Sequence, residues 1–139
     1  MKTEIRYFTK SKKGNTIKLA NFISEKTGLK ALDVTNSLEE DVDQLILVNA
    51  MYAADIDKEV KEFLEANASK IKCLINVNSS ASGKSTIKAV KKVCDKLNIK
   101  VSDKEFHTAA SWLFINKGRP NEADFNRLAE FIQTLNINE

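Results

Sequence analysis

The segment LILVNAMYAADIDKEVKEFL, residues 45–64, contains the strongest fold signal in the chain. It begins with an uninterrupted apolar run, Leu45–Val48, which is typical of a parallel strand covered on both faces. A loop of polar and small residues follows, and from about Asp57 the apolar residues recur at helical spacing. A buried strand, a short loop and a helix in this order predict one unit of an α/β protein.

The same alternation extends in both directions along the chain. A helix is expected from Thr16 to Gly28, because glycine is well suited to end it. Asn121 and Asp124 are spaced to cap the last helix, and Ser37–Glu40 has capping-box spacing that predicts a short helical turn. The other expected strands cover residues 5–8, 29–34, 71–77, 101–107 and 112–115, and a further helix covers residues 87–97.

Length and composition indicate one domain, residues 1–139, because no linker or repeat interrupts the pattern. The alternation favours a three-layer α/β sandwich with a parallel sheet. Hydrophobic residues make up 42% and charged residues 29% of the chain, which excludes disordered and fibrous classes. No apolar run approaches the roughly 20 residues of a membrane span, and no signal peptide is recognisable. We therefore expect a cytoplasmic protein without membrane contact.

The charges are unevenly distributed along the chain. Residues 1–30 carry eight basic and two acidic residues, residues 31–70 carry three and ten, and residues 71–139 carry eleven and seven. This asymmetry indicates surfaces with different tasks. The basic residues are not interleaved with aromatics, so nucleic-acid binding is not expected. Cys73 and Cys94 lack CxxC spacing, so we expect reduced thiols and no metal site.

Sheets of this class bind ligands at the carboxyl ends of their strands. The first such loop is TKSKKGNT, residues 9–16, between a strand and a helix. Its helix-start amides, its hydroxyls and its single glycine predict an anion site. Gly14 allows a phosphate to approach the backbone, and the Ser11 and Thr16 hydroxyls can donate to it. The alternative is a polar loop in which Asn15 or Thr16 only caps the helix.

The loops after the third and fourth expected strands carry less specific signals. Residues 49–55 place Tyr52 among small residues, where it can offer a flat face to a planar ligand or cover the end of the core. Residues 78–83 are rich in hydroxyls and small side chains. They can present backbone amides to a ligand or form a turn before a helix capped by Ser82. The residues alone leave these alternatives open.

Together the three loops resemble those of flavodoxins, and the resemblance extends over essentially the whole chain. Ser11–Thr16 follows the flavodoxin phosphate-loop pattern Ser/Thr-x-Thr-Gly-x-Thr, except that Lys13 replaces the central threonine. Residues 45–64 are similar to the third strand, flavin loop and helix of that family. Residues 101–124 are similar to the C-terminal part of its small bacterial members.

The resemblance implies a doubly wound, five-stranded parallel sheet in the order 2-1-3-4-5 that binds FMN without a covalent link. It implies that Tyr52 stacks on the flavin ring and that Met51 forms a second apolar wall. Trp112 could cover the flavin edge, although core packing is the expected use of a lone tryptophan. The implied cofactor-binding residues are Thr9, Ser11, Lys13, Gly14, Asn15, Thr16, Asn49, Ala50, Met51, Tyr52, Asn78, Ser79, Ser80, Ala81 and Gly83.

The function implied by the resemblance is electron transfer between redox partner proteins by a monomer that is not itself an enzyme. The acidic residues Asp55, Asp57, Glu59 and Glu62 beside the expected flavin loop are suited to steer a basic redox partner. One alternative is a flavodoxin-like domain that has lost FMN and acts as an interaction module. A second alternative is a small flavin-dependent quinone reductase.

Three other functions are poorly supported by the residues. Gly83–Thr86 is similar to the end of a nucleotide-binding loop, but Asn78 stands where that pattern requires glycine. Thr9 and Asn49 stand where a response-regulator receiver needs acidic residues. The single histidine, His107, has no nucleophile near it in sequence, so hydrolase chemistry is not expected.

The expected flavin loop yields a prediction, because residues 49–57 contain no glycine. Many flavodoxins have a glycine here whose peptide flips to hydrogen-bond the reduced flavin N5. Other residues meet a steric penalty at positive φ, so we expect weak stabilisation of the neutral semiquinone. Stepwise photoreduction of the FMN-loaded protein should show little blue semiquinone by visible absorption, and a large, persistent blue species would contradict this expectation.

Overall fold

Strand β3 (Gln44–Ala50) lies at the centre of the sheet, and all seven of its residues are buried. It pairs in parallel with β1 (Thr3–Tyr7) on one side and with β4 (Cys73–Ser80) on the other. The short β2 (Ala31–Asp33) and the long β5 (Lys100–Ala109) form the two edges, also in parallel. The order β2-β1-β3-β4-β5 confirms the predicted five-stranded doubly wound sheet.

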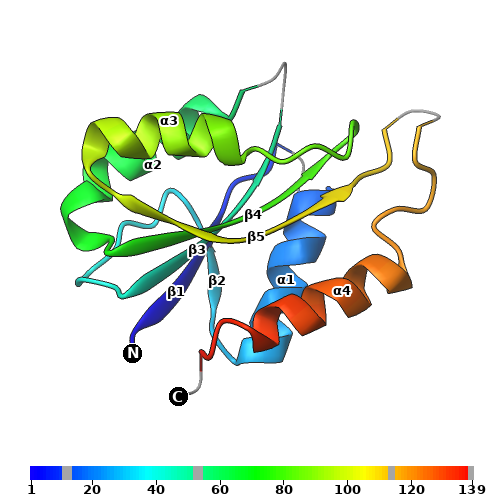
Figure 1. Cartoon of the computed structure of the whole chain (residues 1–139), viewed down its shortest axis with the longest axis horizontal. Helices are drawn as coiled ribbons and strands as arrows, with labels where there is room; N and C mark the ends of the chain where they lie inside the picture. The colour runs from blue at the N-terminus through cyan, green and yellow to red at the C-terminus, as the bar shows by residue number, and fades with distance from the viewer. Residues whose placement is uncertain (11–13, 52–54, 113–114, 138–139) are drawn as a thin grey trace.

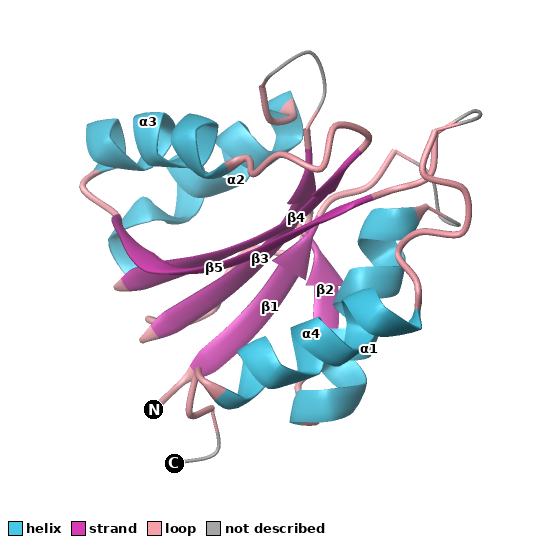
Figure 2. Ribbon diagram, turned by 45° about the vertical axis from the view of Figure 1, so that its right-hand side comes forward, coloured by secondary structure: helices cyan, strands magenta, loops and turns pink. Residues whose placement is uncertain are grey.

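Helices cover both faces of this sheet in a computed structural model (Figure 1) that describes residues 1–10, 14–51, 55–112 and 115–137. Helices α1 (Asn15–Thr27) and α4 (Glu122–Gln133) lie on one face. Helices α2 (Lys58–Asn67) and α3 (Ile87–Leu97) lie on the other (Figure 2), and a short 3-10 turn, Ala68–Lys70, follows α2. Within the described ranges, no helix is both long and apolar enough to cross a bilayer.

Successive residues of β3 point into two separate hydrophobic cores. Leu47 belongs to the core beneath α2 and α3, together with Val60. Val48, the next residue, belongs to the core beneath α1 and α4, together with Leu19. Because both faces are covered, β3 needs apolar residues at consecutive positions, which explains the unbroken run in the sequence.

Two predicted helix ends are confirmed. Helix α1 ends at Gly28, whose φ of 75° lies in the left-handed region that glycine adopts most readily. At the start of α4, the backbone N–H of Asp124 donates to Oδ1 of Asn121 at 3.1 Å. The backbone N–H of Asn121 donates in return to Oδ2 of Asp124 at 2.9 Å, which completes the capping box.

The helical turn predicted at Ser37–Glu40 is wrong, because distant side chains bond to the backbone of this segment. The Arg6 guanidinium donates to the carbonyls of Asn36 and Ser37, at 2.8 and 3.2 Å. The backbone N–H of Leu38 donates to the side chain of Asn67 at 2.9 Å. These tertiary bonds satisfy groups that a helical turn would have paired locally.

The strand predicted at residues 112–115 lies partly outside the described residues. Its described ends, Trp112 and Ile115, form an isolated bridge with each other, through two backbone hydrogen bonds of 3.0 and 2.9 Å, and do not join the sheet. The preceding strand is longer than predicted, because β5 continues to Ala109. Likewise, β4 continues through Ser80 into residues predicted as a loop.

Candidate functional site

A cavity of about 400 Å³ opens at the carboxyl ends of β1, β3, β4 and β5, where the predicted fold places a ligand. The segments that follow all four strands contribute to its wall. We call it the candidate cavity, and its lining residues are Thr9, Gly14, Asn15, Thr16, Ala50, Met51, Ser79, Ser80, Ala81, Ala110, Ser111 and Trp112.

The N-terminus of α1 forms one wall of the candidate cavity. Gly14 is its N-cap residue and has an extended backbone, with no side-chain hydrogen bond capping the helix among the described residues and no acidic residue in the first turn. The first backbone N–H groups of a helix lack partners within it, and the helix dipole makes this end positive. By contrast, the start of α4 is occupied by its own capping box. The α1 terminus therefore offers donors to an anion inside the cavity.

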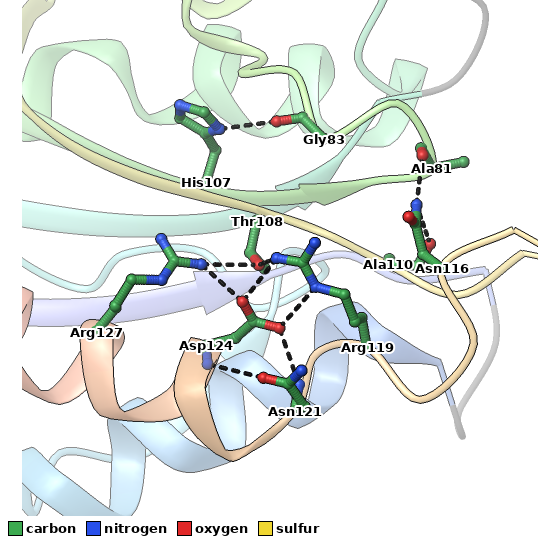
Figure 3. Close-up of polar contacts among 10 residues, drawn as sticks. All are labelled: Ala81, Gly83, His107, Thr108, Ala110, Asn116, Arg119, Asn121, Asp124 and Arg127. Atoms are coloured by element: carbon green, nitrogen blue, oxygen red, sulfur yellow. Dashed lines mark hydrogen bonds and ion pairs between the residues drawn. The ribbon is translucent and has the colours of Figure 1, made fainter.

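The segment that follows β5 closes the other side of the cavity. The Asn15 side chain, at the start of α1, donates to the carbonyl of Ser111 at 3.3 Å. The Asn116 side chain donates to the carbonyls of Ala81 and Ala110, at 2.6 and 3.3 Å (Figure 3). These bonds tie the last loop to the start of α1 and to the end of β4, so three of the cavity walls hold one another in place.

A buried carboxylate anchors the far end of the same loop. Figure 3 shows Asp124 between two guanidinium groups, with Arg119 Nη2 at 2.8 Å and Arg127 Nη2 at 2.7 Å from its Oδ1. The Arg119 guanidinium holds the pKa of Asp124 well below its usual range, with further contributions from the Asn121 backbone and Arg127. Because Arg119 also accepts a 2.9 Å backbone bond from Ser111, the ion pair positions a cavity-lining residue.

Trp112 lies at the rim of the candidate cavity, and the expectation that it packs in the core is wrong. Its side chain is 59% exposed, and the neighbouring Ile115 is 48% exposed. Both belong to the segment after β5, and neither is part of the two hydrophobic cores. The tryptophan therefore offers an apolar surface beside the cavity, which is the second use considered for it from the sequence.

The structure brings together nine of the sequence-predicted site residues at the candidate cavity: Thr9, Gly14, Asn15, Thr16, Ala50, Met51, Ser79, Ser80 and Ala81. Ser11, Lys13 and Tyr52 lie outside the described residues. Asn49, Asn78 and Gly83 are not among the lining residues. Ala110 and Ser111 were missed, although they belong to a run of small residues after a predicted strand, which is the signal that marked residues 78–83.

Asn49 and Asn78 belong instead to a buried polar network on the α3 side of the sheet. The Thr86 hydroxyl donates to Oδ1 of Asn49 at 2.7 Å, and the Asn49 amide donates to Oδ1 of Asn76 at 2.8 Å. Asn78 accepts from the backbone N–H of Thr86 at 3.1 Å and donates to the carbonyl of Lys84 at 3.1 Å. The side chains of the network, Asn49, Asn76, Asn78 and Thr86, are fully buried. The network fixes the ends of β3 and β4 relative to residues 81–86.

The same network weakens the nucleotide-binding interpretation of Gly83–Thr86. Such loops need glycine at the position of Asn78, whereas the Asn78 side chain is buried and bonded to the backbone of Thr86 and Lys84. Gly83 lines a second cavity of about 570 Å³, which shares Met51 with the candidate cavity. There its carbonyl accepts a 2.9 Å hydrogen bond from Nδ1 of His107, which gives that histidine a structural role. Among the described residues, no cluster of three or more potential metal ligands occurs.

Comparison with known proteins identifies the fold but no family by sequence. No protein-family model matches the chain, and no curated protein matches it. Among solved structures, a flavodoxin from the domain Archaea superposes with a TM-score of 0.75 over 100% of both chains, at 13% identity. Megasphaera elsdenii flavodoxin in its two-electron reduced form gives 0.66 over 95% of this chain and 98% of its own, at 19% identity. The apo form of EmoB, an NADH:FMN oxidoreductase, gives 0.66 over 96% and 88%, at 13% identity.

The chain therefore has the flavodoxin-like α/β fold, which confirms at the level of the fold the resemblance drawn from the sequence. The candidate cavity lies at the carboxyl ends of the strands, where proteins of this architecture bind their ligands.

The buried network yields a prediction about stability. Thr86→Val removes a hydroxyl that serves both Asn49 and Asn76, at 2.7 and 3.0 Å, and so leaves buried amide groups unpaired. We expect a loss of about 2–3 kcal/mol in the free energy of unfolding by urea. The same change at the exposed Thr35 should cost no more than about 0.5 kcal/mol. Equal effects at the two positions would contradict the proposed role of the network.

The Asp124 ion pairs yield a prediction about pH. Because the pKa of this carboxyl is lower in the folded than in the unfolded state, its contribution is complete above the unfolded pKa of about 4 and declines as the pH falls below it. At pH 7, Asp124→Asn should lower the free energy of unfolding by about 2 kcal/mol. That deficit should shrink below about pH 4. Asp103→Asn, on the exposed edge strand, serves as the control, and a deficit independent of pH would refute the assignment.

Proposed function

We propose that the chain binds FMN noncovalently in the candidate cavity and carries electrons between partner proteins. The observation that carries this proposal is the N-terminus of α1, which has neither a capping side chain nor an acidic residue among its described positions and which opens into a cavity of about 400 Å³. A helix start of this kind binds phosphate. The flavodoxin-like fold supports the choice of a flavin mononucleotide among phosphate-bearing ligands.

The residues of the cavity fit the chemistry of FMN. The backbone N–H groups at Gly14, Asn15 and Thr16, together with the buried Thr16 hydroxyl, would hold the phosphate. The small side chains of Ser79–Ala81 and Ala110–Ser111 leave room for a planar ring beside them. Met51 and Trp112 supply apolar walls. When bound, FMN supplies one- and two-electron transfer, and the protein contributes binding, orientation and electrostatics.

The surroundings of the cavity are suited to hold a ligand without rearrangement. Asn116 fixes the loop after β5 to Ala81 and Ala110. Asn49 and Asn78 fix the ends of β3 and β4 from the opposite face of the sheet. Binding loses less conformational entropy where the walls are already ordered. We propose that Asn49 and Asn78 act in this way, as positioning residues rather than as direct contacts to the cofactor.

A small flavin-dependent quinone reductase is the second candidate function. The second cavity supports it, because this cavity of about 570 Å³ shares Met51 with the candidate cavity and could admit a second planar molecule. Steady-state oxidation of NADH or NADPH by the FMN-loaded protein, with a quinone as acceptor, separates the two functions. A carrier should show no turnover without a partner protein. We further propose that the carrier acts as a cytoplasmic monomer.

Titration of the apoprotein with FMN, followed by quenching of flavin fluorescence, tests the proposed function. The wild-type chain should bind FMN at one site and should bind riboflavin more weakly, since riboflavin lacks the phosphate. Gly14→Asp places a carboxylate at the helix start, where it caps the N–H groups and repels the phosphate. We expect this variant to bind FMN at least about tenfold more weakly, a loss of about 1.4 kcal/mol.

Asn21→Asp is the matched control, because it adds the same charge to an exposed position farther along α1. Its affinity for FMN should stay within about twofold of the wild type, a difference of about 0.4 kcal/mol. Absence of quenching by the wild-type chain at excess FMN would reject the proposed function and favour the interaction module. Equal affinity of the wild type for FMN and riboflavin would reject the assigned phosphate site.

A further inference from the structure

Helix α3 carries a regular row of basic side chains on its outer surface. Lys88, Lys92 and Lys96 are spaced four residues apart, so they lie on one face of the helix about 6 Å apart along its axis. All three are exposed, and none makes an ion pair with another described residue. We call these three residues the lysine row.

The lysine row forms one wall of a groove between α3 and α2. The groove has a volume of about 680 Å³, and Ala89, Val93 and Leu97 of α3 also line it. Asp55, Lys61 and Glu65 line the other side, where Lys61 pairs with Asp55. The groove therefore combines a basic wall, apolar surface and an opposite wall on which Glu65 is the acid that pairs with no other described residue.

The acidic residues expected to steer a basic partner are largely neutralised by nearby lysines. Lys61 lies 2.7 Å from Asp55, and Lys58 lies 3.4 Å from Glu62. Asp57 is buried with Lys10 at 3.4 Å, and burial raises its pKa. Three of the four acids are thus paired, whereas the lysine row is not. Among the described residues that line the groove, three lysines and one acid have no ion pair, so the unpaired charge there is positive.

The groove and the candidate cavity are linked by residues that each shares with the second cavity. Lys88 and Ala89 line both the groove and the second cavity. Met51 lines both the second cavity and the candidate cavity. A molecule that binds in the groove over the first turn of α3 therefore has the second cavity between it and the Met51 wall of the proposed cofactor site.

We propose that the lysine row is the docking surface for an acidic redox partner protein, which would exchange electrons with the cofactor across the Met51 wall. This inference rests on the proposed function. Carboxylates of the partner would face Lys88, Lys92 and Lys96, and apolar side chains would cover Val93 and Leu97. Opposite charges speed the encounter of two proteins and fix their orientation.

Glu65 favours a protein over a nucleic acid as the occupant. A nucleic acid is negative along its whole length, so filling the groove would bring phosphates against this carboxylate. A protein surface can place a basic or neutral residue there and acidic residues along the lysine row. The apolar floor also suits side chains better than a sugar–phosphate backbone.

Electron transfer from a reduced, acidic plant-type [2Fe–2S] ferredoxin to the FMN-loaded chain tests the proposal. Each ferredoxin gives up one electron and returns to its oxidised form, and the flavin accepts that electron. The second-order rate constant, measured by stopped flow, should fall steeply between about 20 and 300 mM salt, as expected for opposite charges. The variant Lys88→Glu, Lys92→Glu, Lys96→Glu should react at least about tenfold more slowly at low salt.

The control variant carries the same change in net charge on the opposite face of the sheet. Lys18 and Lys26 are exposed on α1, and the exposed Lys30 follows that helix. Their triple replacement by glutamate should slow the reaction by less than about threefold, since the sheet and its helix layers separate these sites from the groove by more than a Debye length of about 8–10 Å. Equal slowing by the two triple variants would overturn the proposal.

Two further measurements separate this proposal from the proposed function. Fluorescence anisotropy of labelled ferredoxin with the apoprotein measures docking without a flavin, and it should show the same dependence on the lysine row even if FMN does not bind. Normal FMN binding with a reaction insensitive to the lysine row would reject the docking surface alone. Tighter, row-dependent binding of a labelled single-stranded oligonucleotide than of ferredoxin would assign the groove to nucleic acid and reject the proposal.

Discussion

Burial of β3 on both faces is the constraint on which the rest of the molecule depends. A strand with every residue buried must pair its backbone on both sides and must be covered above and below. Parallel partners β1 and β4 meet the first requirement, and the helices α1 to α4, in two layers, meet the second. Parallel pairing then brings the carboxyl ends of the strands to one end of the sheet, and so creates the candidate cavity.

Much of this architecture can be predicted from the sequence, because the fold depends on local patterns. The apolar run at residues 45–48, Gly28 and the Asn121–Asp124 capping box all behave as their local chemistry predicts. The prediction of a helical turn at Ser37–Glu40 is wrong because this segment depends on distant residues. Its backbone is bonded by Arg6 and Asn67, which lie far away in the sequence. No local pattern contains that information.

The site is predictable in position but only partly in detail. A polar residue at the end of a strand can face a ligand or a helix on the other face, and the choice depends on strand register. Asn49 falls two residues after Leu47, which packs beneath α2 and α3, so alternation turns it toward that side and away from the cavity. Ser79 has the opposite orientation and lines the cavity. Trp112 was misjudged because a lone tryptophan usually packs in the core, whereas the segment after β5 carries it to the rim.

The long edge strand β5 has a consequence for how copies of this protein meet. An unpaired strand of ten residues offers its free backbone groups as a template for another chain. Here the exposed positions in its middle are Asp103 and Lys104, which a second strand would have to desolvate on approach. Charged side chains at such an edge act as gatekeepers against edge-to-edge aggregation. The charges at Asp103 and Lys104 therefore oppose the pairing of a second copy along this uncovered edge of the sheet.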